Sequence, residues 1–147
     1  MKKALVLMLV ALMLVACGPN PAEFWNSELH PLVVEFANQI ELSSNTPREA
    51  LSPVISQMVS INTRIEVLSE SDAVPDCAVA GLAQILVATA SVIDAAEDWV
   101  SVDSSWSEGE WEEHDRTADT AWLSADELLA TALVTTMEDC RLTSLAD

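Results

Sequence analysis

The densest group of chemically active side chains in the sequence is the 13-residue run from 103 to 115. It carries six carboxylates and the imidazole of His114. Carboxylate oxygens suit Ca²⁺, and an imidazole among them suits softer divalent ions. The run is not an EF-hand loop, because the alternating acidic positions are absent and Gly109 falls at the wrong offset. The run therefore indicates either a weak divalent-ion site or an ordinary solvated acidic turn. The candidate ligands are Glu110, Glu113, His114 and Asp115.

Four of the five tryptophans lie within 24 residues of one another, around the same acidic run. Tryptophan is enriched at binding hot spots because its large apolar ring also carries an N–H donor. Trp99 and Trp122 occupy positions that we expect to face a neighbouring helix, which favours core packing for both. Trp106 and Trp111 are less constrained. We interpret them as the best candidates for a surface that contacts a glycan, a peptide or a partner protein.

The remaining chemistry-bearing residues form no recognisable catalytic group. His30 and His114 are the only histidines. Neither lies in a Cys-x-x-Cys-His haem signature or a His-Glu-x-x-His zinc helix, and no nucleophile stands at a recognisable spacing from them. A bundle with Met and His could ligate haem, but Met58 and Met137 fall on core stripes, where filling gaps is the usual role of Met. The sequence therefore predicts no enzymatic activity and no cofactor.

Length and charge limit the function classes further. The chain has 147 residues, enough for one small domain, and 24 acidic against 6 basic residues give a formal charge of −18. A nucleic-acid binder needs a basic patch to neutralise phosphates, and no such patch can be drawn here. The composition, half apolar and one fifth charged, is typical of a folded protein.

The first 16 residues have the pattern of a secretory signal. Lys2 and Lys3 supply a charged start, an unbroken apolar run covers residues 4–16, and Gly18 and Pro19 follow Cys17 as helix breakers. The run is too short to cross a membrane as a helix. We expect residues 1–16 to be removed during export.

The residues Leu14-Val15-Ala16-Cys17 resemble the lipobox of bacterial lipoproteins. The resemblance implies transfer of diacylglycerol to the Cys17 thiol, cleavage before this residue and acylation of the new amino terminus. Two or three acyl chains hold a protein firmly at a membrane. The implied location is the cell envelope. The cysteine is followed by Gly18 and not by Asp. In a Gram-negative host, the implied location is therefore the periplasmic face of the outer membrane. An ordinary cleaved signal or a buried N-terminal helix is the alternative.

Removal of the signal changes the charge and leaves an even number of cysteines. The remaining 131 residues contain four arginines, no lysine and all 24 acidic residues, a formal charge of −20. Such a surface repels anionic lipid headgroups and nucleic acid, and it indicates either a saline habitat or compositional drift. With Cys17 lipidated, Cys77 and Cys140 remain in an oxidising compartment. We expect a disulfide between them.

The pattern of caps, prolines and apolar spacing predicts an all-α fold in one domain over residues 21–147, after a lipidated tether at 17–20. Asn20-Pro21-Ala22-Glu23 and Thr46-Pro47-Arg48-Glu49 each combine a cap residue, a proline at the first helical position and a glutamate at the third. Pro31 indicates a kink or an alternative helix start. No sustained alternation predicts a strand. The expected helices cover about 21–42, 47–69, 75–102 and a last stretch that starts at 108 or 116 and ends at 142.

Apolar stripes predict that these helices form an antiparallel (up-down-up-down) four-helix bundle. The third expected helix has no charge between Cys77 and Ile93 and is interpreted as the most buried. If Cys77 pairs with Cys140 across an antiparallel hairpin, the sequence positions of any two residues in contact add to about 217. This register places a large side chain against a small one at each level, as in Ala88 with Leu129 and Trp99 with Ala118.

These patterns predict a lipid-anchored envelope protein that serves as a non-enzymatic interaction or scaffold module. The expected partners are the membrane, through lipid on Cys17, and an envelope protein; nucleic acid is not expected. We expect the tether to emerge at the same end of the bundle as the acidic run. A protein that binds a divalent ion or a small ligand at the acidic, Trp-rich run 103–115 is the alternative.

Overall fold

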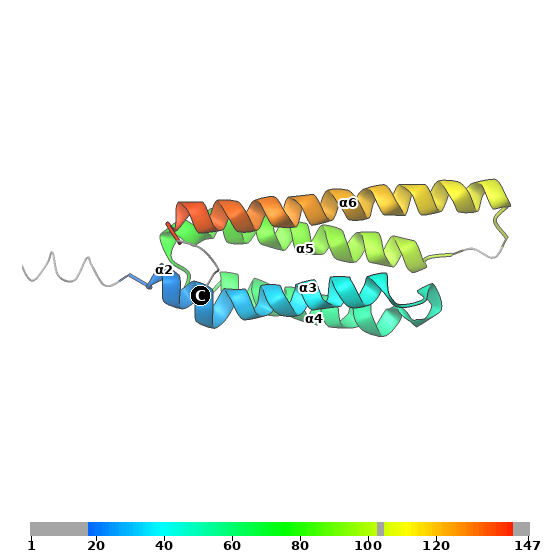
Figure 1. Ribbon diagram of the computed structural model, residues 1–147. Coiled ribbons are helices and arrows are strands. Elements are labelled where there is room, and N and C mark those ends of the chain that lie inside the picture. Colours follow the sequence, from blue (N-terminus) through cyan, green and yellow to red (C-terminus); the bar gives the residue numbers. More distant parts are fainter. Residues whose placement is uncertain (1–17, 103–104, 143–147) are drawn as a thin grey trace, which may run out of the picture.

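A computed structural model of the chain describes residues 18–102 and 105–142. Within these ranges the chain is helical apart from short connections, and no strand is present (Figure 1). The all-α prediction is confirmed. The predicted signal at 1–16, the predicted lipidation site Cys17 and the acidic residue Asp103 lie outside the described residues.

The first helical stretch changes its winding instead of breaking at the proline. It begins as α2 (Pro21–Phe24), continues as the π-helical turn η1 (Trp25–Leu29) and ends as α3 (His30–Ser44). The predicted cap is confirmed, because the Asn20 side chain accepts hydrogen bonds from the backbone N–H groups of Ala22 at 3.0 Å and Glu23 at 3.4 Å. Pro31 has no backbone N–H to donate, so the regular α-helical hydrogen bonds are interrupted there. The wider π-helical turn accommodates the missing bond.

The second helix starts later than expected. A short 3₁₀ turn, η2 (Arg48–Ala50), precedes α4 (Ser52–Ser69), so the predicted start at residue 47 is wrong. Thr46 does not cap a new helix, because its hydroxyl donates to the Leu42 carbonyl of the preceding helix at 2.7 Å. Pro53 would break a helix that began at residue 47, but it is tolerated in the first turn of α4.

The acidic run belongs largely to a helix. The 3₁₀ turn η3 (Asp76–Ala78) leads into α5 (Val79–Val100), and α6 covers Glu108–Asp139. The structure thus selects the earlier of the two expected starts for the last helix. A capping box fixes this start: the Glu110 carboxylate accepts from the Ser107 backbone N–H at 2.7 Å, and Ser107 caps in return. Most of residues 103–115 are therefore the first turns of α6, and the expectation of an acidic turn is wrong for them.

Helices α5 and α6 pack closely along their length. The disulfide joins Cys77 to Cys140, as expected, with their Cα atoms 5.1 Å apart. One turn further along, a Cβ atom at Gly81 would overlap Thr136 Oγ1 and lie 3.0 Å from Thr136 Cα. In both pairs, Cys77 with Cys140 and Gly81 with Thr136, the sequence positions add to 217, as the predicted register requires.

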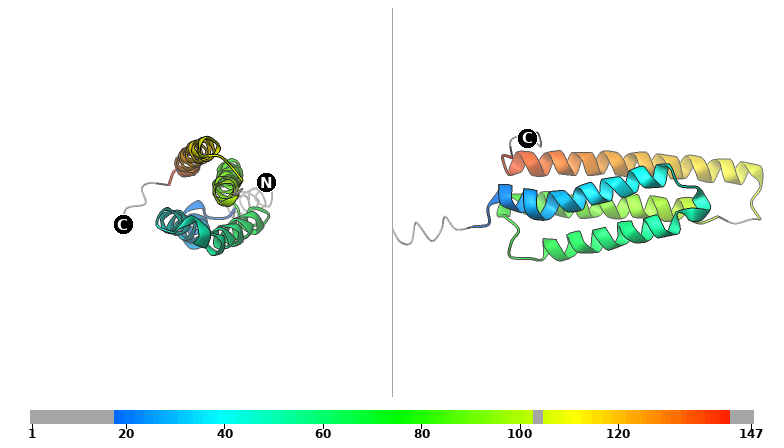
Figure 2. Two further views of the ribbon diagram at one scale, coloured as in Figure 1. Left: turned by 90° about the vertical axis from the view of Figure 1, so that its right-hand side faces the viewer. Right: turned by 60° about the horizontal axis from the view of Figure 1, so that its bottom comes forward.

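The core lies between all four long helices. α6 packs mainly on α5, α5 also packs on α4, and α4 packs on α3 (Figure 2). α5 has more buried residues than any other described helix, as its lack of charge predicted. In the described part of the chain, only the segment Asp76–Val100 is a helix long and apolar enough to cross a membrane. Its contacts with two neighbours agree with its interpretation as a core helix. The largest fully buried side chains include Leu29, Phe36, Met58, Ile61, Ile65, Leu82 and Ile85.

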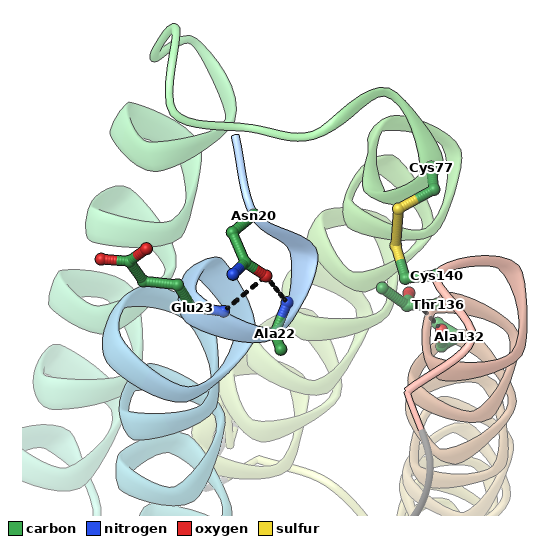
Figure 3. Close-up of a disulfide and its surroundings, with 7 residues drawn as sticks. All are labelled: Asn20, Ala22, Glu23, Cys77, Ala132, Thr136 and Cys140. Atoms are coloured by element: carbon green, nitrogen blue, oxygen red, sulfur yellow. Dashed lines mark hydrogen bonds between the residues drawn. A yellow bond between two sulfur atoms is a disulfide. The ribbon is translucent and has the colours of Figure 1, made fainter. Parts of the chain in front are cut away.

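The described chain enters the fold at the disulfide end. Figure 3 shows Asn20 beside the end that carries Cys77 and Cys140. A shallow hollow there joins Asn20 and Phe24 to Ala73, in the connection that leads to α5. The expectation that the tether emerges at the acidic end is therefore wrong. In a bundle whose helices alternate in direction, the first and third helices start at the same end, and the third starts at the disulfide.

Candidate functional site

An arginine and two tryptophans organise the end of the molecule that lies opposite the disulfide. The Arg48 guanidinium carbon lies 4.0 Å from the centre of the Trp99 ring and 5.4 Å from that of Trp111. Its Nη2 donates to Asp115 Oδ1 at 2.6 Å. The rings and the carboxylate leave only 18 % of the Arg48 side chain exposed. Arg48 thus links η2 to the end of α5 and the start of α6, and it orders this end of the fold.

The electrostatics of this arrangement favour the charged form of Asp115. The hydrogen bond from Arg48 is the main cause that holds the pKa of Asp115 below its ordinary value. The Asp115 side chain is 44 % exposed, so solvent screens much of the pair. The pKa of Glu110 is also lowered, chiefly by the hydrogen bond from the Ser107 hydroxyl and then by that from the Ser107 backbone.

The proposed contact residues Trp106 and Trp111 lie at this same end and pack against each other. Their ring centres are 5.7 Å apart in an edge-to-face arrangement, and Trp106 also lies 4.8 Å from the His114 ring. His114 Nε2 is 2.8 Å from the Asp98 carbonyl oxygen, which can only accept, so Nε2 carries the proton. Both tryptophans are partly exposed. We call Arg48, Trp106, Trp111, His114 and Asp115 the distal cluster.

The four candidate metal ligands do not converge. Each is occupied separately: Glu110 caps α6, Glu113 pairs with Arg116, His114 contacts the Asp98 carbonyl and Asp115 pairs with Arg48. No group of three possible ligands forms among residues 18–102 and 105–142. Glu110, Glu113 and His114 share one side of α6 at spacings of three and four residues, but each is bonded to a different partner.

Two tryptophans that pack against the core, as predicted, also border a cleft beside the distal cluster. Trp99 and Trp122 are only partly buried, and both line a half-open cavity of about 290 Å³. Trp99 also lines an adjoining hollow of about 600 Å³ that contains Arg48 and Trp111. We call the first cavity the tryptophan cleft. Its lining comes from the end of α3, from α5, from α6 and from Leu51; the polar members are Ser43, Ser44, Thr46 and Asp119.

The other candidate residues have packing roles. Met58 is fully buried in α4 and Met137 packs against the core, in agreement with gap filling. His30 lies 5.9 Å from the Trp25 ring in the first helical stretch.

The key residue that sequence reasoning missed is Arg48. The available signal was its rarity, because the predicted mature chain has only four arginines. A comparison of the chain with protein-family models, with curated proteins and with solved structures found no match.

Proposed function

We propose that this protein is an exported, lipid-anchored, non-enzymatic module that holds a binding surface away from the membrane. In this proposal the domain is an up-down-up-down four-helix bundle, Cys17 carries the lipid, and the distal cluster contacts an envelope protein. In a Gram-negative host, Gly18 after the cysteine favours the periplasmic face of the outer membrane.

The observation that carries the proposal is the placement of the two ends. The described chain begins at Gly18, next to the predicted lipidation site, and enters the fold beside the disulfide. The distal cluster lies at the other end of α5, which has 22 residues and is therefore about 33 Å long. An anchor at one end and a partly exposed Trp and Arg surface at the other suit a module that reaches from the membrane to a partner.

Charge and preorganisation support the same proposal. The predicted mature chain carries −20, so its surface would be repelled by anionic headgroups, and the lipid alone would hold it at the membrane. The rings of Trp106 and Trp111 are fixed against each other and against His114 and Arg48. A partner would therefore lose little side-chain entropy on docking.

Lipidation is tested by the intact mass of the protein recovered from membranes. We expect a chain that starts at Cys17 and carries added acyl mass, and we expect Cys17→Ser to lose that mass. Gly18→Ala is the matched control, because it keeps the thiol and should remain acylated. A native chain that lacks acyl mass, or that still contains residues 1–16, would contradict the proposal.

The binding surface is tested by site-specific photo-crosslinking in native envelopes. A photoreactive residue at Glu112, which is exposed beside Trp111, should form a protein adduct. The same residue at Glu138, exposed on α6 near the disulfide, should not. Trp111→Ala should remove the adduct at position 112. Equal adducts at both positions, or an adduct that survives Trp111→Ala, would refute the distal surface.

A further inference from the structure

The tryptophan cleft has a composition that selects for positive charge. Its apolar lining consists of Trp99, Trp122, Leu51 and small alanine side chains of α5 and α6. Asp119 is the only charged side chain in its lining. Within the described ranges no basic side chain pairs with Asp119, so its charge is available to a ligand.

The hydroxyl groups that line the cleft are restricted to accepting. Ser43 and Ser44 both donate to the Ile40 carbonyl, at 2.6 and 3.1 Å, and Thr46 donates to the Leu42 carbonyl at 2.7 Å. A hydroxyl has one proton, so these bonds leave only oxygen lone pairs for a ligand. These three hydroxyl groups therefore offer acceptors that complement an N–H or a polarised C–H donor.

The position of the cleft adds to this preference. Ser43 and Ser44 form the last turn of α3, and the C-terminal end of a helix carries a partial negative charge of roughly half a unit. Arg48 lines the adjoining hollow and not the cleft, and Asp115 balances its charge, while Arg116, three residues before Asp119 on α6, pairs with Glu113.

Trp99 already binds a cation within the protein. The Arg48 guanidinium lies over this ring at 4.0 Å, and Trp99 contributes to both the hollow that contains Arg48 and the tryptophan cleft. Trp99 thus makes one cation contact within the protein and also lines the open cleft. Cations attract the faces of tryptophan more strongly than those of other aromatic residues, and aromatic cages of this kind hold alkylated ammonium groups.

We propose that the tryptophan cleft binds a small organic ammonium ion of about the size of choline. Trp99 and Trp122 would contact the ammonium group, Asp119 would neutralise its charge, and the three hydroxyl oxygens would accept from its substituents. The volume of about 290 Å³ is at the lower limit of small-ligand pockets, which excludes larger ligands such as an oligosaccharide. This inference is independent of lipid attachment and of the protein contact proposed for the distal cluster.

The test compares choline with its neutral isostere, 3,3-dimethylbutan-1-ol, in a titration of the full chain in non-ionic detergent. The indole N–H resonances of the five tryptophans are followed by NMR and assigned from single Trp→Phe variants. Choline should shift Trp99 and Trp122 and leave Trp25 unchanged. The neutral alcohol should bind about tenfold more weakly. Added salt should weaken choline binding alone.

Two carboxylate variants separate the cleft from the general acidity of the protein. Asp119→Asn should weaken choline binding about threefold, as expected for a partly screened charge pair. Asp126→Asn, which changes an exposed carboxylate two turns further along α6 outside the cleft, should leave the affinity unchanged. The proposal is overturned if choline does not bind, if the alcohol binds equally well, if Trp99 and Trp122 do not shift, or if both variants have the same effect.

Discussion

Substitution of Gly81 by alanine tests the close approach of α5 and α6, on which the positions of both ends depend. A Cβ atom at residue 81 would overlap Thr136 Oγ1 and would lie 2.8 Å from Thr136 Cβ and 3.0 Å from Thr136 Cα. Thr136 has little freedom to move, because it is 1 % exposed and its hydroxyl donates to the Ala132 carbonyl at 2.7 Å. The two helices must therefore separate locally.

The expected change in stability follows from three contributions, of which the last opposes the other two. Overpacking of a core costs about 1–3 kcal/mol. Loss of the Thr136 hydrogen bond adds about 1 kcal/mol if the side chain rotates away. The higher helix propensity of alanine returns about 1 kcal/mol. We expect Gly81→Ala to lower the free energy of unfolding by about 1–3 kcal/mol.

Gly109→Ala is the matched control, because the same chemical change occurs near the start of α6, where a Cβ atom would meet nothing within 4 Å. It should raise the free energy of unfolding by about 0.5–1 kcal/mol. Denaturant unfolding of both variants, monitored by circular dichroism with the disulfide intact, measures the two values. Thr136→Ala in the Gly81→Ala background should recover part of the loss, because it removes the overlapping oxygen. If Gly81→Ala stabilises the protein as much as Gly109→Ala does, the proposed packing of α5 and α6 is wrong.

Three further predictions concern the ends of the bundle. Replacement of Cys77 and Cys140 by alanine opens a loop whose ends are 63 residues apart in the sequence. It should lower the free energy of unfolding by about 4 kcal/mol, or by less if the native bond is strained. An unchanged denaturation midpoint would refute this prediction. Arg48→Ala should lower the free energy of unfolding by about 1–2 kcal/mol, because it removes a cation from an aromatic ring and a charge-assisted hydrogen bond. A decrease below roughly 0.5 kcal/mol, the scale of an ordinary surface substitution, would show that Arg48 does not order this end. The lowered pKa of Asp115 stabilises the folded state at pH values above about 3.9, the pKa of an aspartate in an unfolded chain. This contribution is lost as the pH falls through the pKa that Asp115 has in the folded state. Acid titration followed by tryptophan fluorescence should therefore show a shallower loss of stability for Asp115→Asn than for wild type or Asp126→Asn.

The helices and their pairing could be predicted because local signals agreed with the fold. Asn20 caps the first helix as its spacing predicted, and the register derived from Cys77 and Cys140 also places Gly81 against Thr136. The helix start expected at residue 47 failed because the Thr46 hydroxyl bonds backward to the preceding helix. The start of the last helix stayed open between two positions, although Ser107 and Glu110 have the spacing of a capping box.

The distal cluster could be predicted only in part. The acidic run and the crowded tryptophans pointed to the end of the molecule at which the distal cluster lies. The contact between Arg48 and Asp115 joins residues 67 positions apart, and no periodic pattern in the sequence connects them. Trp99 and Trp122 pack against the core, as their spacing in the α5–α6 interface predicted. The spacing could not show that the interface opens into a cleft at this level.

The most direct test of the proposed orientation is energy transfer from the protein to a lipid surface. The lipidated protein is placed in vesicles that contain a headgroup-labelled acceptor, with a fluorescent amino acid at Glu112 or at Glu138. Both positions are exposed on α6 and lie about 39 Å apart at about 1.5 Å per residue. The account predicts strong transfer from position 138 and weak transfer from position 112. Equal transfer from both positions, or stronger transfer from position 112, would contradict it.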